Sequence, residues 1–250
     1  MKFIRQNLEL TGTKENCHAG CTGACTVMLS RWCNERQMYE HRAVSSCSMA
    51  LGSLHRTNIT TVEKVGTTNN PHLIQQRLHD CHAVQCGYDT PGLVMAMYAL
   101  LVHQETITMH DLVKKLSGNL SRCNGYRAVL EAFKVFTTQP SGERKEFEKD
   151  LPDDLKSDDT YPVTFKGEKT CWTIVEKVRD AKSFIIEGKD FFYGYPPVTQ
   201  ITGNVVTLKQ SCGFTIDEEG VIFDSNITIT NLIESLEKYK PINPEGIVPN

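Results

Sequence analysis

The chain lacks the segments and motifs of membrane proteins, secreted proteins and the common hydrolases. Among its 250 residues, no apolar run reaches the roughly 20 residues needed to span a bilayer. Its first residues, MKFIRQNLELTG, contain no apolar signal region. Its eight histidines show no HExxH spacing, and the chain has no GxSxG or Walker loop. We therefore expect a cytoplasmic protein, and no catalytic residues are assigned.

The chain also has no large excess of positive or negative charge. The formal net charge is -3, and the basic residues are spread along the chain rather than clustered. A nucleic-acid-binding surface normally needs such a cluster. Neither nucleic acid nor a membrane is therefore expected as a partner.

Cysteine, in contrast, is abundant, with ten residues. In a reducing compartment, thiols at short spacing indicate metal binding more often than disulfides. Two cysteine-containing stretches precede apolar helical patterns: QCGYDTPG at 85–92 and GNLSRCNGYR at 118–127. We expect Thr90 and Pro91 to be the N-cap and first residue of a helix. Helix N-termini present unpaired N-H groups, which suit an anionic cluster.

These two strings resemble QCGxCTPG and GNLCRCxGYR of the xanthine dehydrogenase and aldehyde oxidase family, whose helical domain binds a 2Fe-2S cluster through four cysteines. Cys86 and Cys123 remain here, while Asp89 and Ser121 stand at the other two ligand positions. Such clusters prefer soft thiolate donors. The resemblance therefore implies a remnant second cluster site that is empty, with Asp89 compensating the helix dipole. The alternative is a cluster with two oxygen ligands.

The first part of the chain resembles the family's ferredoxin-like domain, which binds a cluster through C-x4-C-x2-C and a distant cysteine. Cys17, Cys25 and Cys47 match the first, third and fourth ligands. Thr22 stands at the second position, and Cys21 lies one residue earlier. Consecutive Cα atoms lie about 3.8 Å apart, whereas metal-ligand distances hold to about 0.2 Å, so the loop must be rebuilt for Cys21 to reach iron.

Four thiols nevertheless remain at this first site. We expect them to hold one 2Fe-2S cluster through Cys17, Cys21, Cys25 and Cys47. Two alternatives stay open: the thiols are left over in a loop that no longer closes on metal, or they bind a tetrahedral zinc ion. The first hairpin of the family's ferredoxin sheet has no counterpart before Phe3. We therefore expect a shortened sheet with an exposed edge.

The resemblance implies a multidomain α+β protein. Residues 1–66 correspond to a truncated β-grasp 2Fe-2S ferredoxin-like domain, and residues 67–138 to a four-helix 2Fe-2S-type domain. Residues 139–162 are charged and punctuated by proline, which predicts a linker. Residues 163–250 resemble part of an FAD-binding α+β domain of the PCMH or vanillyl-alcohol-oxidase type.

Local patterns predict several elements within these domains. Strands are expected at 26–32 and around 59–62. The third helix of the helical domain should begin at Thr108 as N-cap, with Asp111 at N3. The four expected helices cover residues 71–82, 91–104, 108–118 and 126–136.

The last segment is not expected to bind FAD. A strand is expected at 163–175, and residues 181–188, AKSFIIEG, fall where the family's loop wraps the FAD pyrophosphate. Glu187 replaces a glycine of that loop, and a carboxylate repels a pyrophosphate. The family's second glycine-rich FAD loop and its molybdopterin domain have no counterpart in this sequence, so neither FAD nor molybdopterin is expected as a cofactor.

Members of the family pass electrons from a molybdenum-hydroxylated substrate through two 2Fe-2S clusters to FAD. The resemblance implies that this chain retains at most one step of that relay. We expect a residual 2Fe-2S electron-transfer module that serves a full-length family member or a flavin or molybdenum subunit. The first alternative is a non-catalytic scaffold, a pseudoenzyme that competes for subunit contacts and binds no cluster. The second is the product of a decaying gene, which barely folds.

Overall fold

The computed structural model describes residues 1–34, 36–138, 140–157, 160–166, 170–175, 190–192, 203–208, 214–216 and 221–223. The chain divides into two compact units, Met1–Ser157 and Asp158–Asn250. Both contain small sheets, and the first adds a layer of helices, which confirms the α+β class. Among the described residues, no helix is long and apolar enough to cross a bilayer.

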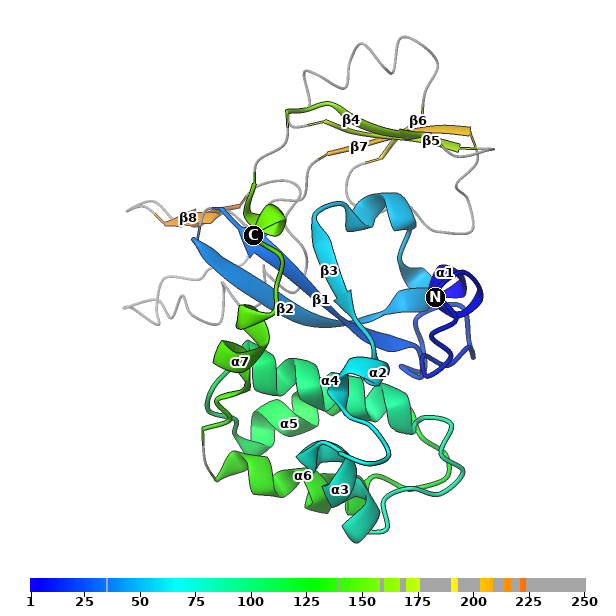
Figure 1. The fold of residues 1–250 in the computed structure, drawn as a ribbon, viewed down its shortest axis with the longest axis vertical. Coiled ribbons are helices and arrows are strands. Elements are labelled where there is room, and N and C mark those ends of the chain that lie inside the picture. The colour runs from blue at the N-terminus through cyan, green and yellow to red at the C-terminus, as the bar shows by residue number, and fades with distance from the viewer. Residues whose placement is uncertain are drawn as a thin grey trace, which may run out of the picture. The chain divides into compact units, whose positions relative to one another are not determined.

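The first unit contains an antiparallel three-stranded sheet in the order β2-β1-β3 (Figure 1). Strand β1 covers Thr26–Cys33, β2 covers Met38–Ser45 and β3 covers Thr57–Thr60. The strand predicted at 26–32 is thus confirmed, and the one predicted around 59–62 is present but ends at Thr60, because Val62 begins a helix. Strand β2 was not predicted, because three consecutive polar residues stand in the middle of its sequence, MYEHRAVS. Short helices flank this sheet: α1 at Lys2–Gln6, η1 at Ser46–Ser48, η2 at Leu51–Leu54 and α2 at Val62–Val65.

The four helices predicted in residues 67–138 are present. Helix α4 is the central one, because it packs against β1, β2 and the neighbouring helices α2, α3, α5 and α7 (Figure 1). Its residues from Leu93 to Val102 are all buried, as expected for a helix that is apolar on every side. The helices are α3 at Leu73–Asp80, α4 at Thr90–His103, α5 at Met109–Leu116 and α6 at Arg127–Lys134, which is followed by η3 at Val135–Thr137.

The helix starts agree with the sequence at α5 and differ by one residue at α4. The Thr108 Oγ1 accepts from the Asp111 N-H at 3.2 Å, and the Asp111 carboxylate accepts from the Thr108 N-H at 2.9 Å, which is the expected capping box. In α4, Asp89 rather than Thr90 is the N-cap, and Pro91 is the second helical residue. Proline fits there because the first-turn N-H groups have no partner within the helix.

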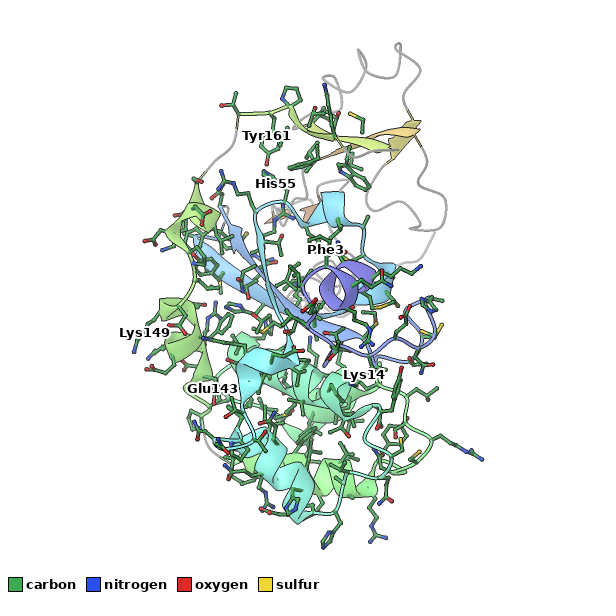
Figure 2. The ribbon with its side chains drawn as sticks, turned by 45° about the vertical axis from the view of Figure 1, so that its right-hand side comes forward. Phe3, Lys14, His55, Glu143, Lys149 and Tyr161 are labelled. Carbon is green, nitrogen blue, oxygen red and sulfur yellow. The ribbon has the colours of Figure 1, made fainter. Side chains whose placement is uncertain are left out.

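The segment predicted as a charged linker contains helix α7, at Glu143–Lys149. Phe147 belongs to the hydrophobic core, and the Glu148 carboxylate lies 2.9 Å from the Nε2 of buried His41 on β2. Burial lowers the pKa of His41. Figure 2 marks both ends of this helix, Glu143 and Lys149. Residues up to Ser157 therefore belong to the first unit, because one phenylalanine anchors a segment whose composition is otherwise that of a linker.

The second unit contains a four-stranded sheet in the order β4-β5-β7-β6 and a separate β8-β9 hairpin. β4 and β5 are antiparallel, whereas β7 is parallel to both β5 and β6. The single strand expected at 163–175 is two strands. Residues 181–188, with Glu187, lie outside the described residues, so the expectation about FAD stays a prediction. The strands are β4 at Val163–Lys166, β5 at Thr170–Val175, β6 at Asp190–Phe192, β7 at Gly203–Leu208, β8 at Phe214–Ile216 and β9 at Val221–Phe223. A further short helix, η4 at Asp153–Lys156, belongs to the first unit.

Candidate functional site

The sheet of the first unit brings two of the candidate cysteines together. Cys25 directly precedes β1 and Cys47 lies just after β2, and these strand ends meet because Thr26 pairs with Ser45. The Cys25 carbonyl accepts hydrogen bonds from the N-H of Ser46 at 3.3 Å and from its hydroxyl at 2.7 Å. Strand register therefore fixes two sulphur-bearing residues that are far apart in the sequence.

Backbone N-H groups of the loop before β1 point at two cysteine sulphurs. The N-H of Cys21 donates to the Cys17 Sγ, and the N-H of Gly20 donates to the Cys47 Sγ, both at 3.2 Å. Hydrogen bonds from the loop, above all from the backbone of Ala19, lower the pKa of Cys17 to about 6. Converging N-H donors of this kind stabilise anionic sulphur. The loop is therefore suited to hold thiolates.

The pKa of Cys47 is shifted in the opposite direction to that of Cys17, although both sulphurs accept a hydrogen bond from an N-H group. Burial, together with the neighbouring Cys25 and Cys17 thiols, whose negative charges would repel that of Cys47, raises the pKa of Cys47 to about 11. A metal cation would reverse this effect, since it favours the thiolate. The Cys47 thiol is therefore neutral near pH 7 unless a cation is bound.

The second ligand position of the loop is occupied by Thr22. Its hydroxyl lies 3.6 Å from the Cys17 Sγ, whereas the thiol of Cys21 is exposed and lies 3.5 Å from the Ala19 carbonyl oxygen. In the described part of the chain, no group of three or more His, Cys, Asp or Glu side chains is gathered closely enough to hold a metal ion. The four-cysteine ligand set therefore stays a prediction, and it requires the Cys21 thiol to turn inward.

The first loop nonetheless fits a 2Fe-2S cluster in chemistry. It supplies soft thiolate donors and N-H groups directed at sulphur, both of which such clusters use. Gly20 and Gly23 have φ of +72° and +70°, a region that glycine adopts without steric cost. These two glycines allow the segment around Cys21 to change conformation.

The second candidate site brings Cys86 and Cys123 together. Both residues are exposed, and a hydrogen bond between their thiols is the main reason that the pKa of Cys123 is raised. At the two positions without cysteine, the Asp89 carboxylate accepts from the Asn124 Nδ2 at 3.2 Å, and the Ser121 Oγ is buried without a hydrogen-bond partner among the described residues.

This second donor set does not fit a 2Fe-2S cluster. Two of its four positions carry oxygen, a harder donor than the thiolates that these clusters prefer. The Asp89 carboxylate is already engaged by a side-chain amide, and it stands at the N-cap of α4. Two thiols and no further soft ligand are left at this site.

The two sites are joined by direct contacts that the sequence did not reveal. The Leu120 N-H donates to the Thr22 carbonyl at 2.9 Å, and the Asn119 Nδ2 donates to the Gly23 carbonyl at 3.1 Å. A Cβ atom at Gly92 would overlap that same carbonyl oxygen. The start of α4 and the loop before α6 therefore pack tightly against the first cysteine loop. The sequence signal that could have predicted this close approach is the glycine at positions 23 and 92, because glycine has no Cβ atom.

Comparison with known proteins identifies relatives of the first unit. A family model described as a [2Fe-2S] binding domain matches residues 61–134. Aldehyde oxidase 1 of Rattus norvegicus is 44% identical over 137 residues, which are 54% of this chain and 10% of that protein. Xanthine dehydrogenase of Drosophila subobscura is 44% identical over 140 residues, which are 56% of this chain and 10% of that protein.

This chain thus spans about a tenth of the length of these curated relatives. Among solved structures, quinoline 2-oxidoreductase from Pseudomonas putida 86 matches with a TM-score of 0.47 and 25% sequence identity. That match covers 60% of this chain and 84% of the other.

Proposed function

Because this chain carries the N-terminal 2Fe-2S region of the xanthine dehydrogenase and aldehyde oxidase family over somewhat more than half of its length, we propose that it is an electron-transfer module with one cluster. The ligands are Cys17, Cys21, Cys25 and Cys47. The observation that carries the proposal is the pair of N-H groups directed at the sulphurs of Cys17 and Cys47. When bound, a 2Fe-2S cluster supplies reversible electron transfer.

Each residue of the loop has a distinct part in this proposal. Cys25 and Cys47 are held in place by the register of β1 and β2. Cys17 is the thiol most readily deprotonated, since loop hydrogen bonds stabilise its thiolate. Cys21 supplies the fourth sulphur by turning away from the Ala19 carbonyl. Thr22, whose hydroxyl now faces Cys17, must move aside when this happens.

The module needs a partner to supply and remove electrons. The related aldehyde oxidase and xanthine dehydrogenase are about ten times as long as this chain's matched segment. We propose that the partner is a full-length relative or a subunit that carries flavin or molybdenum. Second-site residues take no part in the transfer, because only the first loop fits a cluster.

Anaerobic reconstitution with iron and sulphide tests this function. We expect two iron atoms per chain, a visible spectrum typical of 2Fe-2S proteins and a paramagnetic signal after reduction. Cys47→Ser should abolish all three, whereas Cys81→Ser, at a half-buried thiol outside both sites, should leave them unchanged. A colourless wild-type protein with only trace iron would end the proposal.

The ligand assignment has its own test in the same assay. Cys21→Ser should lose the cluster, and Thr22→Cys introduced into that variant should restore it, because it places a thiol where a side chain already faces Cys17. A Cys21→Ser protein that keeps full iron content would remove Cys21 from the ligand set while leaving the cluster itself in place.

A second candidate function is favoured by the completeness of the helical core. Phe133, Leu112 and Ile74 are fully buried and belong to one hydrophobic core. Such a core can persist as a scaffold that binds a full-length relative and competes for its subunit contacts. Pull-down of the metal-free chain with a full-length aldehyde oxidase tests this candidate, and absence of association at micromolar concentration would exclude it.

A further inference from the structure

The two cysteines of the second site form a contact pair that the proposed electron transfer does not use. Cys86 lies in the loop before α4 and Cys123 in the loop before α6, so 37 positions separate them in the sequence (123 − 86). Both are free, exposed thiols, and the Asn124 Nδ2, which donates to the Asp89 carboxylate at 3.2 Å, joins the two loops that carry them. Two thiols on adjoining loops that are both accessible from solvent meet the first requirement for reversible oxidation.

Hydrogen bonds hold the two loops in this arrangement. The Asn124 amide joins them, because its Nδ2 donates to Asp89 while its Oδ1 accepts from the Tyr126 N-H at 3.0 Å. The Tyr126 hydroxyl in turn accepts from the Ser121 N-H at 2.5 Å. The loop around Cys123 is therefore fixed internally and tied to the start of α4. This polar frame holds the two cysteine-bearing loops next to each other.

The backbone beside each thiol has room to adjust. Gly87 follows Cys86 and has φ of +78°, and Gly125, two residues after Cys123, has φ of +66°. A Cβ atom at Gly125 would meet nothing within 4 Å, and one at Gly87 would meet only Val84 at 3.9 Å. A disulfide requires Cβ atoms about 3.5 to 4.5 Å apart. Permissive, uncrowded glycines allow both loops to reach that spacing.

We propose that Cys86 and Cys123 form a dithiol-disulfide couple that is oxidised by low-molecular-weight disulfides of the glutathione class. This inference goes beyond the proposed electron transfer and does not depend on a cluster in the first loop. The oxygen-bearing residues Asp89 and Ser121 favour it, because they leave the two thiols without the soft ligand set that would hold them on iron.

The reaction is a two-step thiol-disulfide exchange. One protein thiolate attacks a sulphur of the small disulfide, which breaks the small molecule's S-S bond, forms a mixed disulfide and releases one small thiol. The second protein thiolate then attacks the protein sulphur of that mixed disulfide, forms the Cys86-Cys123 bond and releases the second small thiol. The protein loses two electrons and two protons, and both are recovered in the two released thiols.

Equilibration of the metal-free full chain in glutathione redox buffers tests the couple. Remaining thiols are alkylated, and tryptic peptides are identified by mass spectrometry. Cleavage at Arg122 and Arg127 releases Cys123 in the short peptide CNGYR, whereas Cys81 and Cys86 share one longer peptide. The measurement is therefore made in the Cys81→Ser variant. We expect the two peptides to be recovered joined, and separated again by reduction.

Single substitutions provide the matched controls. Cys86→Ser and Cys123→Ser should each leave the other cysteine as a stable mixed disulfide with glutathione, because the resolving thiol is missing. Recovery of both wild-type cysteines as separate mixed disulfides, or joined to cysteines of the first loop, would overturn the couple. A reconstituted protein with a second cluster that protects both cysteines would also overturn it. Failure of the first loop to bind iron leaves this assay unaffected, so the two proposals fail separately.

Discussion

The two cysteine sites differ in what surrounds their sulphurs. In the first, backbone N-H groups donate to Cys17 and Cys47, and strand register fixes Cys25 beside Cys47. In the second, Cys86 and Cys123 are exposed, and Asn124 forms hydrogen bonds with Asp89 and with the Tyr126 N-H. The first environment favours a thiolate at Cys17 and disfavours one at Cys47, whereas the hydrogen bonds of the second hold its loop in place.

The helical domain is complete although its site carries only two cysteines. This domain matches the family model, and its buried core is continuous from α3 to α6. The first site has four thiols, but that of Cys21 lies against the Ala19 carbonyl. The number of cysteines therefore does not show how their thiols are oriented at the first site. At the second site, the Asp89 carboxylate is bonded to Asn124, whereas the buried Ser121 hydroxyl has no hydrogen-bond partner among the described residues.

Restoring the missing thiols should convert the second site into a cluster site. In the double variant Asp89→Cys, Ser121→Cys, four soft donors would surround the start of α4, where helix N-H groups favour an anionic cluster. We expect iron content after reconstitution to rise by one cluster per chain, with a second paramagnetic signal. Iron and sulphide analysis with paramagnetic resonance measures this change.

The two single variants are the controls for that experiment. Asp89→Cys and Ser121→Cys alone each leave three thiols, so neither should gain a stable cluster. If the double variant folds but binds no additional iron, the site has lost more than its ligands, and the polar frame around Asn124 is the part to replace next.

In the metal-free protein, Cys17 and Cys47 of the first site should lose their protons at widely different pH values. Loop hydrogen bonds lower the pKa of Cys17 to about 6, so its alkylation by iodoacetamide should be slow below that pH and fast above it. Burial raises the pKa of Cys47 to about 11, so it should stay unreactive through neutral pH. Mass spectrometry of peptides alkylated at each pH measures both midpoints. A shared midpoint for the two thiols would remove the distinction between them.

Much of the fold was predictable because local signals agreed with tertiary packing. The Thr108-Asp111 capping box and the apolar run of α4 each specify one element, and both are present. Helix α7 was missed, since its charged sequence contains a single core residue, Phe147. Strand β2 was missed for a related reason, because its polar His41 is satisfied by partners from distant segments.

The candidate sites were predictable in composition but not in geometry. Motif spacing located the six cysteines of the two candidate sites, including Cys21 one residue before Thr22. Spacing could not show which of these two side chains faces Cys17, because that depends on the left-handed conformations at Gly20 and Gly23. Nor could it show the bond from Leu120 to Thr22, which joins loops almost a hundred residues apart.

Oxidation of the second site should stabilise the protein. Linking Cys86 to Cys123 closes a loop of about 37 residues, and the loss of unfolded-chain entropy then raises the free energy of unfolding by up to about 4 kcal/mol. Urea denaturation of oxidised and reduced protein measures the difference. The Cys86→Ser variant should show no dependence on redox state from this pair, and an equal dependence in that variant would assign the effect elsewhere.

The contact that joins the two sites should be sensitive to a single methyl group. In Gly92→Ala, the added Cβ overlaps the Gly23 carbonyl oxygen, a backbone atom that cannot move without shifting the first loop. Overpacking of this kind costs about 1 to 3 kcal/mol, which exceeds the roughly 1 kcal/mol that alanine gains over glycine in a helix. Gly118→Ala is the matched control, since its Cβ would meet nothing within 4 Å. Urea denaturation should show a loss in the first variant and almost none in the second. A Gly92→Ala protein as stable as wild type would mean that the two sites are neighbours without being packed as one unit.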